Sequence, residues 1–359
     1  MQKPTPLFAL LLFACAAPPP SAEPVVDAGA LLTSARDAGD AGAVAPKPDA
    51  GVLRDGGFRD AGFVDAGVEP EPEPEPEPDA CIPNVAPGRF TIECEGLTYE
   101  LSVPRQCASP GCAVVFDVHG FTMSGVMQEN NTSLAALTQD SDFIVVQPSA
   151  TPAPPASNWS ARQDDARVFD FMMRVADVFR ADRRRLHITG FSDGGWLTWR
   201  FVCEHADVLA SAAPAAASGY CSPERACDFV GAEVPAREIP LLLMLGTQDA
   251  YVEYTCAQEQ VDAVVAAWSM TNEGTVERGD GYHLDRYVSP GGTPFEVLVH
   301  DYASDASVPL IPDLVGHCYP GSEDAGEEPG QIFPFGCAPP NAFHWGERVL
   351  EFFGRSAPQ

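Results

Sequence analysis

The sequence predicts an α/β fold in which a mostly parallel sheet is covered by helices on both faces. From Cys81 onward, short continuous apolar runs alternate with amphipathic helical stretches, which is the pattern of strands joined by helices. Apolar runs without alternation are typical of strands that are buried on both faces. One run is followed by a Gly-x-Ser-x-Gly turn and a helical stretch. Residues 81–359 are long enough to form one substantial core.

Six runs are predicted as strands: Leu97–Val103, Ala113–His119, Phe143–Gln147, Arg185–Phe191, Pro240–Gly246 and Phe295–Tyr302. Helices are predicted over 165–180, 196–204, 258–270 and 344–353, because apolar residues recur there at helical spacing. Segments 148–158, 303–316 and 320–342 are rich in Pro, Gly and acidic residues. They are therefore predicted as loops.

Residues 1–80 have a different composition. Lys3 and the apolar run Leu7–Phe13 predict a signal peptide over residues 1–14. Leu12-Phe-Ala-Cys15 resembles a bacterial lipobox, which predicts a lipidated Cys15 and a surface protein anchored to a bacterial membrane. Ordinary secretion with cleavage near Ala14–Ala17 is the alternative. No other apolar stretch approaches 18 residues, so Cys15 is the only predicted link to a membrane.

The segment from residue 15 to residue 80 is predicted to be a disordered tether. It repeats Asp-Ala-Gly six times and then alternates Glu and Pro from Glu69 to Pro78. Without bulky apolar residues at any period, burial cannot offset the entropy of an ordered chain. The Glu-Pro run should be stiff and extended.

The charge of the chain argues against nucleic-acid binding. The formal net charge is −30, and no lysine follows Lys47. Proteins that bind DNA or RNA through phosphates need a basic stripe. The only basic run, Arg183–Arg185, is interpreted as a solvated loop before a strand. We expect a monomer that takes an ester substrate and has no nucleic-acid partner.

The cysteines predict disulfides. With Cys15 set aside, an even number remains in an exported chain. Nearness in sequence favours Cys107–Cys112, Cys221–Cys227 and Cys318–Cys337, although Cys203, Cys221 and Cys256 leave other pairings open. No pair of C-x-x-C motifs has zinc spacing, so we expect no metal site.

The heptapeptide Gly190–Trp196 contains the strongest motif. Gly-Phe-Ser-Asp-Gly between a strand and a helix matches the nucleophile elbow of α/β-hydrolases. A serine on so tight a turn needs glycines beside it, because a Cβ there collides with the neighbouring elements. The alternative is a glycine-rich turn that holds a serine by chance. Ser192 is the predicted nucleophile.

A serine nucleophile needs a base and a carboxylate behind it, in the chain order Ser, acid, His. Asp249 follows the predicted strand 240–246 and should lie at the carboxyl edge of the sheet, where such sites collect; a turn-forming Asp is the other interpretation. Two histidines fit the base. His317, flanked by Gly316 and a Pro-Gly, is preferred to His300 at the end of the last strand.

Two backbone N–H groups are predicted to form the oxyanion hole. Asp193 follows the nucleophile. Phe121 follows His119-Gly120 at the end of a strand, where a second donor is expected. A simple strand-to-loop turn is the alternative for His119-Gly120.

Five blocks of sequence carry a family resemblance: Asp117-Val-His-Gly-Phe, Gln163-Asp-Asp-Ala-Arg-Val-Phe, Ile188-Thr-Gly-Phe-Ser-Asp-Gly-Gly, Gly246-Thr-Gln-Asp and Gly316-His-Cys-Tyr-Pro-Gly. In this order, over about residues 90–355, the chain resembles the polyhydroxybutyrate depolymerase and feruloyl esterase family of secreted esterases. The resemblance implies an α/β-hydrolase fold and a Ser192–His317–Asp249 triad that acts through an acyl-enzyme without cofactor. In that family the histidine usually follows the last strand closely. Here the loop Ala303–Val315 intervenes, which keeps His300 as an alternative.

The predicted function is therefore that of an exported serine esterase, cleaving hydroxyacyl, feruloyl or acetyl esters of polymers or oligomers. Trp159, Tyr251 and Tyr319 lie near the motifs and are candidate substrate contacts, or else core residues. The competing hypothesis is a non-catalytic surface lipoprotein that uses a hydrolase scaffold for binding.

Overall fold

The computed structural model describes residues 79–83, 86–220, 227–231, 234–305, 315–332 and 334–356. The predicted signal peptide, Cys15 and the tether up to residue 78 lie outside these residues. The described strands are β1 (Gly88–Cys94), β2 (Leu97–Val103), β3 (Ala113–Val118), β4 (Phe143–Ser149), β5 (Leu186–Phe191), β6 (Ser211–Ala215), β7 (Leu241–Gly246), β8 (Thr271–Gly279), β9 (Tyr282–Val288) and β10 (Pro294–His300). The helices are α1 (Gly125–Thr132), α2 (Leu134–Leu137), α3 (Asp165–Val178), α4 (Asp193–Glu204), α5 (Tyr254–Ala267) and α6 (Trp345–Ser356), with a short 3₁₀ turn at Arg105–Ala108.

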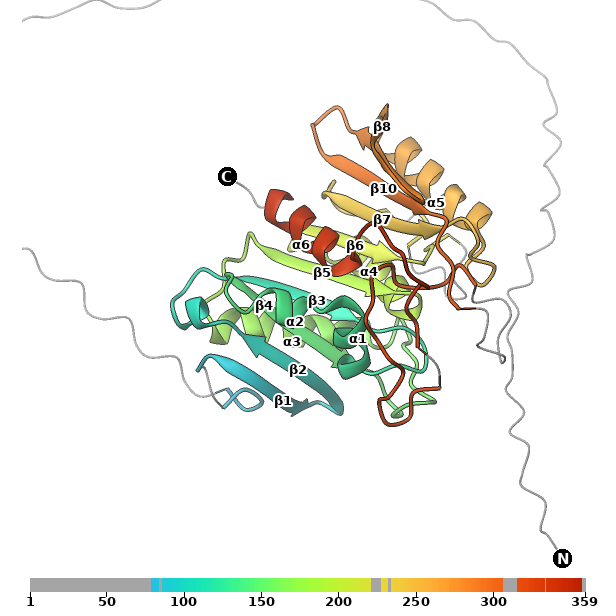
Figure 1. Ribbon diagram of the computed structural model, residues 1–359. Coiled ribbons are helices and arrows are strands. Elements are labelled where there is room, and N and C mark those ends of the chain that lie inside the picture. The colour runs from blue at the N-terminus through green and yellow to red at the C-terminus, as the bar shows by residue number, and fades with distance from the viewer. Residues whose placement is uncertain are drawn as a thin grey trace, which may run out of the picture. The chain divides into compact units, whose positions relative to one another are not determined.

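All described strands belong to one sheet in the order β1-β2-β4-β3-β5-β6-β7-β10-β9-β8 (Figure 1). The central strands from β4 to β10 pair in parallel. The edge strands β1 and β2, and β9 and β8, pair antiparallel. The mostly parallel sheet is confirmed, and so are its six predicted strands. Strands β1, β6, β8 and β9 were not predicted.

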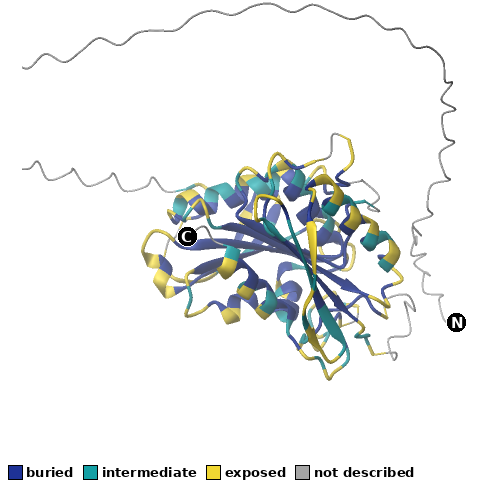
Figure 2. Ribbon diagram, turned by 90° about the horizontal axis from the view of Figure 1, so that it is seen from above, coloured by how far each residue is buried: buried dark blue, intermediate teal, exposed yellow. Residues whose placement is uncertain are grey.

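Helices cover both faces of the sheet, as predicted; Figure 2 shows the buried strands between two helical layers. Alternate residues of β3 separate the two cores, because successive side chains of a strand point to opposite faces. Val114 and Phe116 belong to the core that contains side chains of α3, α4 and α5, whereas Ala113 and Val115 belong to the core that contains side chains of α1, α2 and α6. The continuous apolar run of β3 therefore follows from its burial on both sides.

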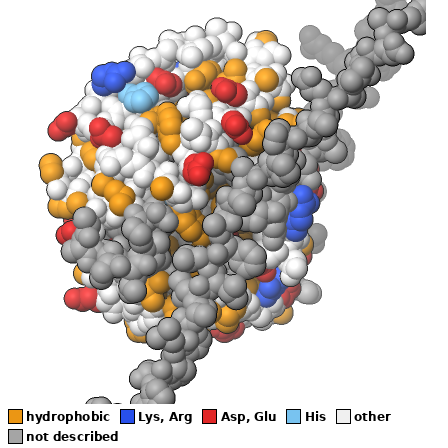
Figure 3. All heavy atoms as spheres, turned by 90° about the vertical axis from the view of Figure 1, so that its right-hand side faces the viewer, with side chains coloured by type: hydrophobic (Ala, Val, Ile, Leu, Met, Phe, Trp, Pro, Cys, Tyr) orange, Lys and Arg blue, Asp and Glu red, His pale blue; other side chains and the backbone are white. Residues whose placement is uncertain are grey.

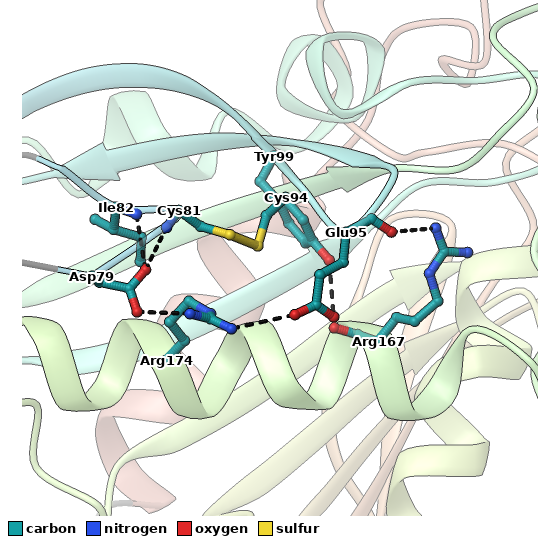
Figure 4. Close-up of a disulfide and its surroundings, with 8 residues drawn as sticks. All are labelled: Asp79, Cys81, Ile82, Cys94, Glu95, Tyr99, Arg167 and Arg174. Carbon is teal, nitrogen blue, oxygen red and sulfur yellow. Dashed lines mark hydrogen bonds and ion pairs between the residues drawn. A yellow bond between two sulfur atoms is a disulfide. The ribbon is translucent and has the colours of Figure 1, made fainter.

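The chain enters the described domain through a clamp of charged groups (Figure 4). The Asp79 carboxylate accepts hydrogen bonds from the N–H groups of Cys81 (2.8 Å) and Ile82 (2.9 Å). Arg174 of α3 pairs with Asp79 at 2.7 Å and with Glu95 at 3.3 Å. The Cys81–Cys94 disulfide then joins the entering segment to the end of β1. Two residues after Asp79, the first described residue, the chain is thus covalently fixed to the sheet.

The disulfides correct one predicted pairing. Cys107–Cys112 and Cys318–Cys337 are present as predicted. Cys227 pairs with Cys203 at the end of α4, with a Cα–Cα distance of 5.7 Å, so the predicted Cys221–Cys227 bond is wrong. The segment after β6 packs so closely on Cys227 that a Cβ on Gly219 would meet the Cys227 carbonyl oxygen at 2.0 Å. The fold, rather than nearness in sequence, selects the partner.

Among the described residues, the structure contains no helix with both the length and the apolarity that crossing a bilayer requires.

Candidate active site

Ser192 stands on a strained turn between β5 and α4. Its φ of 55° and ψ of −114° lie in a region that non-glycine residues rarely adopt. The turn is held by a hydrogen bond from the Ser192 N–H to the Ala215 carbonyl, 2.9 Å. A Cβ on Gly190 would meet Gly194 O at 2.4 Å, and one on Gly194 would meet Val118 O at 2.2 Å. The glycines of the motif are therefore required by close backbone approach, as the sequence predicts.

Asp249 lies in a turn directly after β7 and has both carboxylate oxygens occupied. Oδ1 accepts from the N–H groups of Tyr251 (2.9 Å) and Val252 (2.8 Å). Oδ2 lies 2.7 Å from Nδ1 of His317, and both side chains are almost fully buried. Because the turn's own N–H groups hold Oδ1, the second oxygen is directed at the imidazole.

His317 reaches this position because the residue before it, Gly316, has no side chain. A Cβ on Gly316 would meet Asp249 N and Gln248 C at 2.3 Å. The imidazole packs against the ring of Phe191, the residue before Ser192, with 4.8 Å between ring centroids. Residues from three distant segments thus meet at the carboxyl edge of the parallel strands.

His300 lies near this pair without joining it. It ends β10, is buried, and stacks on Tyr302 with 5.6 Å between ring centroids. Its Nδ1 has no hydrogen-bond partner, and burial lowers its pKa to about 4. A base that is this reluctant to take a proton, and that lacks the contact to Asp249, fits the catalytic role less well than His317.

The predicted oxyanion loop follows β3 and packs on the elbow. A Cβ on Gly120 would lie 3.4 Å from the Phe191 carbonyl oxygen and 3.3 Å from its ring. His119 donates from Nδ1 to the Gly120 carbonyl (2.7 Å) and accepts from the Ala150 N–H at Nε2 (2.9 Å). Burial lowers the His119 pKa to about 4, so this neutral ring braces the loop, consistent with its exclusion as a base.

Asp193 ties the elbow to a second loop. Its carboxylate accepts a hydrogen bond from the Trp159 N–H at 2.6 Å, and the Trp159 indole N–H donates to the His119 carbonyl at 3.0 Å. The Asp193 backbone lies at the N-terminus of α4, where the helix dipole favours negative charge. The loops that carry Phe121 and Asp193 are therefore fixed to each other through Trp159.

The three predicted substrate contacts differ in exposure. Tyr251 is 39% exposed, and its ring centroid lies 5.4 Å from that of His317. Trp159 and Tyr319 are buried in the core, which favours the core interpretation of both residues over the prediction of substrate contact. Each of them instead uses its polar group inside the protein, Trp159 on His119 and Tyr319 on Gln128. Phe121, 42% exposed, is a further aromatic surface at this edge.

The sequence analysis missed a buried polar cluster beneath the loops. Asp117, near the end of β3, accepts hydrogen bonds from Gln128, Thr132 and Gln147. The sequence did contain an indication of this cluster, because Asp117 is the one charged residue inside an otherwise apolar strand.

Two other parts of the surface are weaker candidates for a functional site. A cavity of about 220 Å³ is lined by β7–β10 and α6, where Glu296 accepts from both Arg286 and Arg355. Its charges are paired with one another, and no member of the Ser192, Asp249 and His317 set lines it. On the face shown in Figure 3, the described basic side chains are separated by acidic and hydrophobic ones. Among the described residues, no cluster of His, Cys, Asp and Glu could hold a metal ion.

Comparison with known proteins finds similarity to esterases. No protein-family model matches the chain. Over 146 residues, 41% of this chain, it is 24% identical to the bifunctional acetylxylan esterase/xylanase of Neocallimastix patriciarum. Over 92 residues, 26% of this chain, it is 35% identical to feruloyl esterase B of Piromyces equi. The matched regions span only 20% and 16% of those two proteins.

A solved structure covers more of the molecule. The acetyl xylan esterase from Aspergillus awamori is 13% identical, and the similarity covers 74% of this chain and 99% of that one with a TM-score of 0.53. At this identity the likeness speaks for the fold alone. The chain has the α/β-hydrolase fold, as the elbow motif predicts.

Proposed function

We propose that this protein is an exported carboxylic ester hydrolase in which Ser192 is the nucleophile, His317 the general base and Asp249 the group that orients the base. The observation that carries the proposal is the buried 2.7 Å contact between Asp249 and His317. The His317 imidazole packs on Phe191, the residue before a serine held in a strained elbow. Convergent polar groups held on a rigid scaffold are typical of a catalytic site.

The hydrogen bonds around Asp249 support these roles. Its Oδ2 accepts Nδ1–H of His317, which leaves Nε2 as the basic nitrogen. In the first half-reaction, Nε2 takes the Ser192 hydroxyl proton while Oγ attacks the ester carbonyl. The proton then passes to the leaving alcohol as the C–O bond breaks, and the acyl-enzyme forms. Water, deprotonated by the same nitrogen, releases the carboxylic acid.

The tetrahedral oxyanion formed in both steps needs donors that are already in place. The backbone N–H groups of Asp193 and Phe121 are proposed for this role. Loss of one such donor typically costs about 3 kcal/mol of transition-state stabilisation. The bracing of both loops through Trp159 reduces the reorganisation that this stabilisation would otherwise require.

For the substrate we propose acetyl or feruloyl esters of polysaccharides. The names of the two sequence relatives support this class, and the exposed rings of Tyr251 and Phe121 offer flat surfaces on which sugar or aromatic groups can stack. Hydroxybutyrate oligomers, suggested by the family resemblance, are the second substrate class to test.

Replacing Ser192 tests the mechanism. Ser192→Ala should abolish hydrolysis of p-nitrophenyl acetate and labelling by a fluorophosphonate probe, while thermal unfolding stays close to wild type. A panel of p-nitrophenyl acyl esters, acetylated xylan, methyl ferulate and hydroxybutyrate oligomers ranks the substrates. A wild-type protein that hydrolyses nothing and takes no label would support the binding-only scaffold instead.

Export and anchoring are proposed from different observations. Disulfides such as Cys81–Cys94 and Cys318–Cys337 fit an oxidising compartment. Attachment through a lipidated Cys15 is a prediction from sequence. Expression of Cys15→Ser in a bacterial host should move the protein from the membrane fraction to the soluble exported fraction, and an unchanged membrane fraction would contradict the anchor.

A further inference from the structure

We infer that Tyr319 is a positioning residue for His317, held in place by a buried hydrogen-bonded chain that runs from its hydroxyl through Gln128 to Asp117. The inference rests on the proposed function, because it concerns the base of that reaction. Tyr319 lies two residues after His317.

Tyr319 contacts the catalytic segment through its ring. The ring stacks on Phe191 with 4.0 Å between centroids and an interplanar angle of 24°. Phe191 also packs against the His317 imidazole, with 4.8 Å between ring centroids. Phe191 is also the residue bonded to Ser192. The position of the Tyr319 ring therefore limits where both the base and the nucleophile can lie.

The hydroxyl of Tyr319 fixes the ring. It donates to Oε1 of Gln128 at 2.5 Å, and Nε2 of the same amide donates to Oδ1 of Asp117 at 2.5 Å. Thr132 and Gln147 donate to the other carboxylate oxygen of Asp117, at 2.6 and 3.0 Å. Because Nε2 of Gln128 faces Asp117, the amide oxygen of Gln128 faces Tyr319. An amide oxygen can only accept, so the Tyr319 hydroxyl donates in this arrangement.

Burial makes the hydrogen bonds from Tyr319 through Gln128 to Asp117 select one position of the Tyr319 ring. Tyr319, Gln128 and Asp117 are all fully buried, and a buried polar group without a partner costs far more than a satisfied one contributes. Any other placement of the Tyr319 ring breaks the hydrogen bond to Gln128. An apolar core would leave the ring free to slide over Phe191, whereas the hydroxyl selects one position.

The backbone of Tyr319 is held independently. Its N–H donates to the Phe335 carbonyl (2.8 Å), its carbonyl accepts from the Cys337 N–H (2.9 Å), and the Cys318–Cys337 disulfide joins the same two segments. These contacts persist when the hydroxyl is removed. A Tyr319→Phe variant should therefore fold, and its defect should report on the hydroxyl alone.

The test compares Tyr319→Phe with Tyr99→Phe. Tyr99 is also buried, and its hydroxyl donates to the Arg167 carbonyl at 3.4 Å, outside the proposed site. Tyr319→Phe should lower kcat for p-nitrophenyl acetate about tenfold with KM nearly unchanged, since small displacements of a catalytic group cost this much or more. Its acid limb in the pH profile of kcat/KM should move to lower pH, because a displaced imidazole has a weaker contact with Asp249. Tyr99→Phe should change neither quantity.

A double variant separates positioning from stability. Tyr319→Phe leaves the Gln128 oxygen unpaired, and adding Gln128→Met removes that acceptor together with the amide that donates to Asp117. The double variant should therefore be less stable than Tyr319→Phe, whereas its kcat should stay at the level of the single variant, because both changes break the same hydrogen bond. Gln128→Met alone breaks that bond from the other side and replaces Tyr319→Phe should the latter not fold. A kcat that falls further with the loss of stability would show a merely structural role, as would a folded Tyr319→Phe with wild-type kcat and pH profile. Ser192→Ala is measured alongside, because hydrolysis by that variant would refute the proposed function rather than the role of Tyr319.

Discussion

Asp249 and Asp117 are both buried carboxylates, at the ends of two parallel strands, but their partners differ in kind. Asp249 receives two backbone N–H groups and an imidazole that can take up a proton. Asp117 receives two amides and a hydroxyl, all neutral. Burial outweighs these hydrogen bonds and raises the pKa of Asp117 to about 7. Position at the sheet edge therefore does not distinguish the two carboxylates. The ionisable partner of Asp249 does, and it is this partner that fits the proposed catalytic role.

The largest effect is expected from removal of the imidazole next to Asp249. His317→Ala should lower kcat by about 10⁶, the loss seen when one member of a catalytic unit is removed. His300→Ala, which deletes a neighbouring buried imidazole, should change kcat by less than about threefold and lower the melting temperature. Steady-state kinetics with p-nitrophenyl acetate measure both. A reversed order of the two variants would move the base to His300.

Asp249→Asn should give the next largest loss. The amide preserves the shape but favours the wrong tautomer of His317, which in a comparable triad costs about 10⁴ in kcat. Asp117→Asn, the same substitution in the interior cluster, should cost less than about tenfold. Equal losses in the two variants, measured at one pH on folded protein, would remove the distinction between the two carboxylates.

The raised pKa of Asp117 predicts a pH dependence of stability. The folded state keeps the proton up to about pH 7, whereas the unfolded chain loses it near 3.8. Folding is therefore favoured by this group below pH 4, and that contribution declines as the pH rises from 4 to 7. Each unit of pKa difference corresponds to about 1.4 kcal/mol.

Urea unfolding of wild type and Asp117→Asn between pH 4 and pH 8 measures this decline. The Asn side chain does not titrate, so the unfolding free energy of wild type relative to the variant should fall by several kcal/mol up to pH 7 and then level off. A difference that stays constant over this range would mean that Asp117 is ionised throughout.

The smallest effect is expected from replacing Tyr251, the exposed residue beside His317. Tyr251→Leu keeps the backbone N–H that holds Asp249 and removes only the ring beside His317. KM for methyl ferulate should rise about fivefold, within the 1–3 kcal/mol that one pocket contact contributes, while hydrolysis of p-nitrophenyl acetate stays nearly constant. An equal loss on both esters would assign the ring to the catalytic step instead of to substrate binding.

Strands were predicted correctly where their residues are apolar throughout. The central strands are long apolar runs, since both of their faces are covered. Strand β6 was not predicted, because Ser211–Ala215 consists of small residues and contains Pro214. Small residues are needed here because the elbow backbone lies close by: a Cβ on Gly195 would meet that of Ala217 at 2.6 Å. The β8–β9 hairpin was not predicted because most of its residues are polar and at least partly exposed.

The aromatic residues near the motifs show the limit of sequence spacing. Tyr251 and Tyr319 lie at similar distances along the chain from a motif residue, yet one is exposed and the other fully buried. Spacing cannot distinguish them, because burial is decided by segments that are remote in sequence. For Tyr319 these are α1, which supplies Gln128, and the segment of Phe335 and Cys337.

The α/β-hydrolase fold, the elbow at Ser192 and the candidate acid Asp249 could be predicted because they follow from local patterns: apolar runs, a glycine-flanked turn and an acid after a strand. Three features could be seen only in the folded protein: His317 rather than His300 as the partner of Asp249, the pairing of Cys203 with Cys227, and the cluster around Asp117. Each of these is a contact between segments far apart in the chain. Such contacts are set by how the layers pack, which no single stretch of sequence encodes.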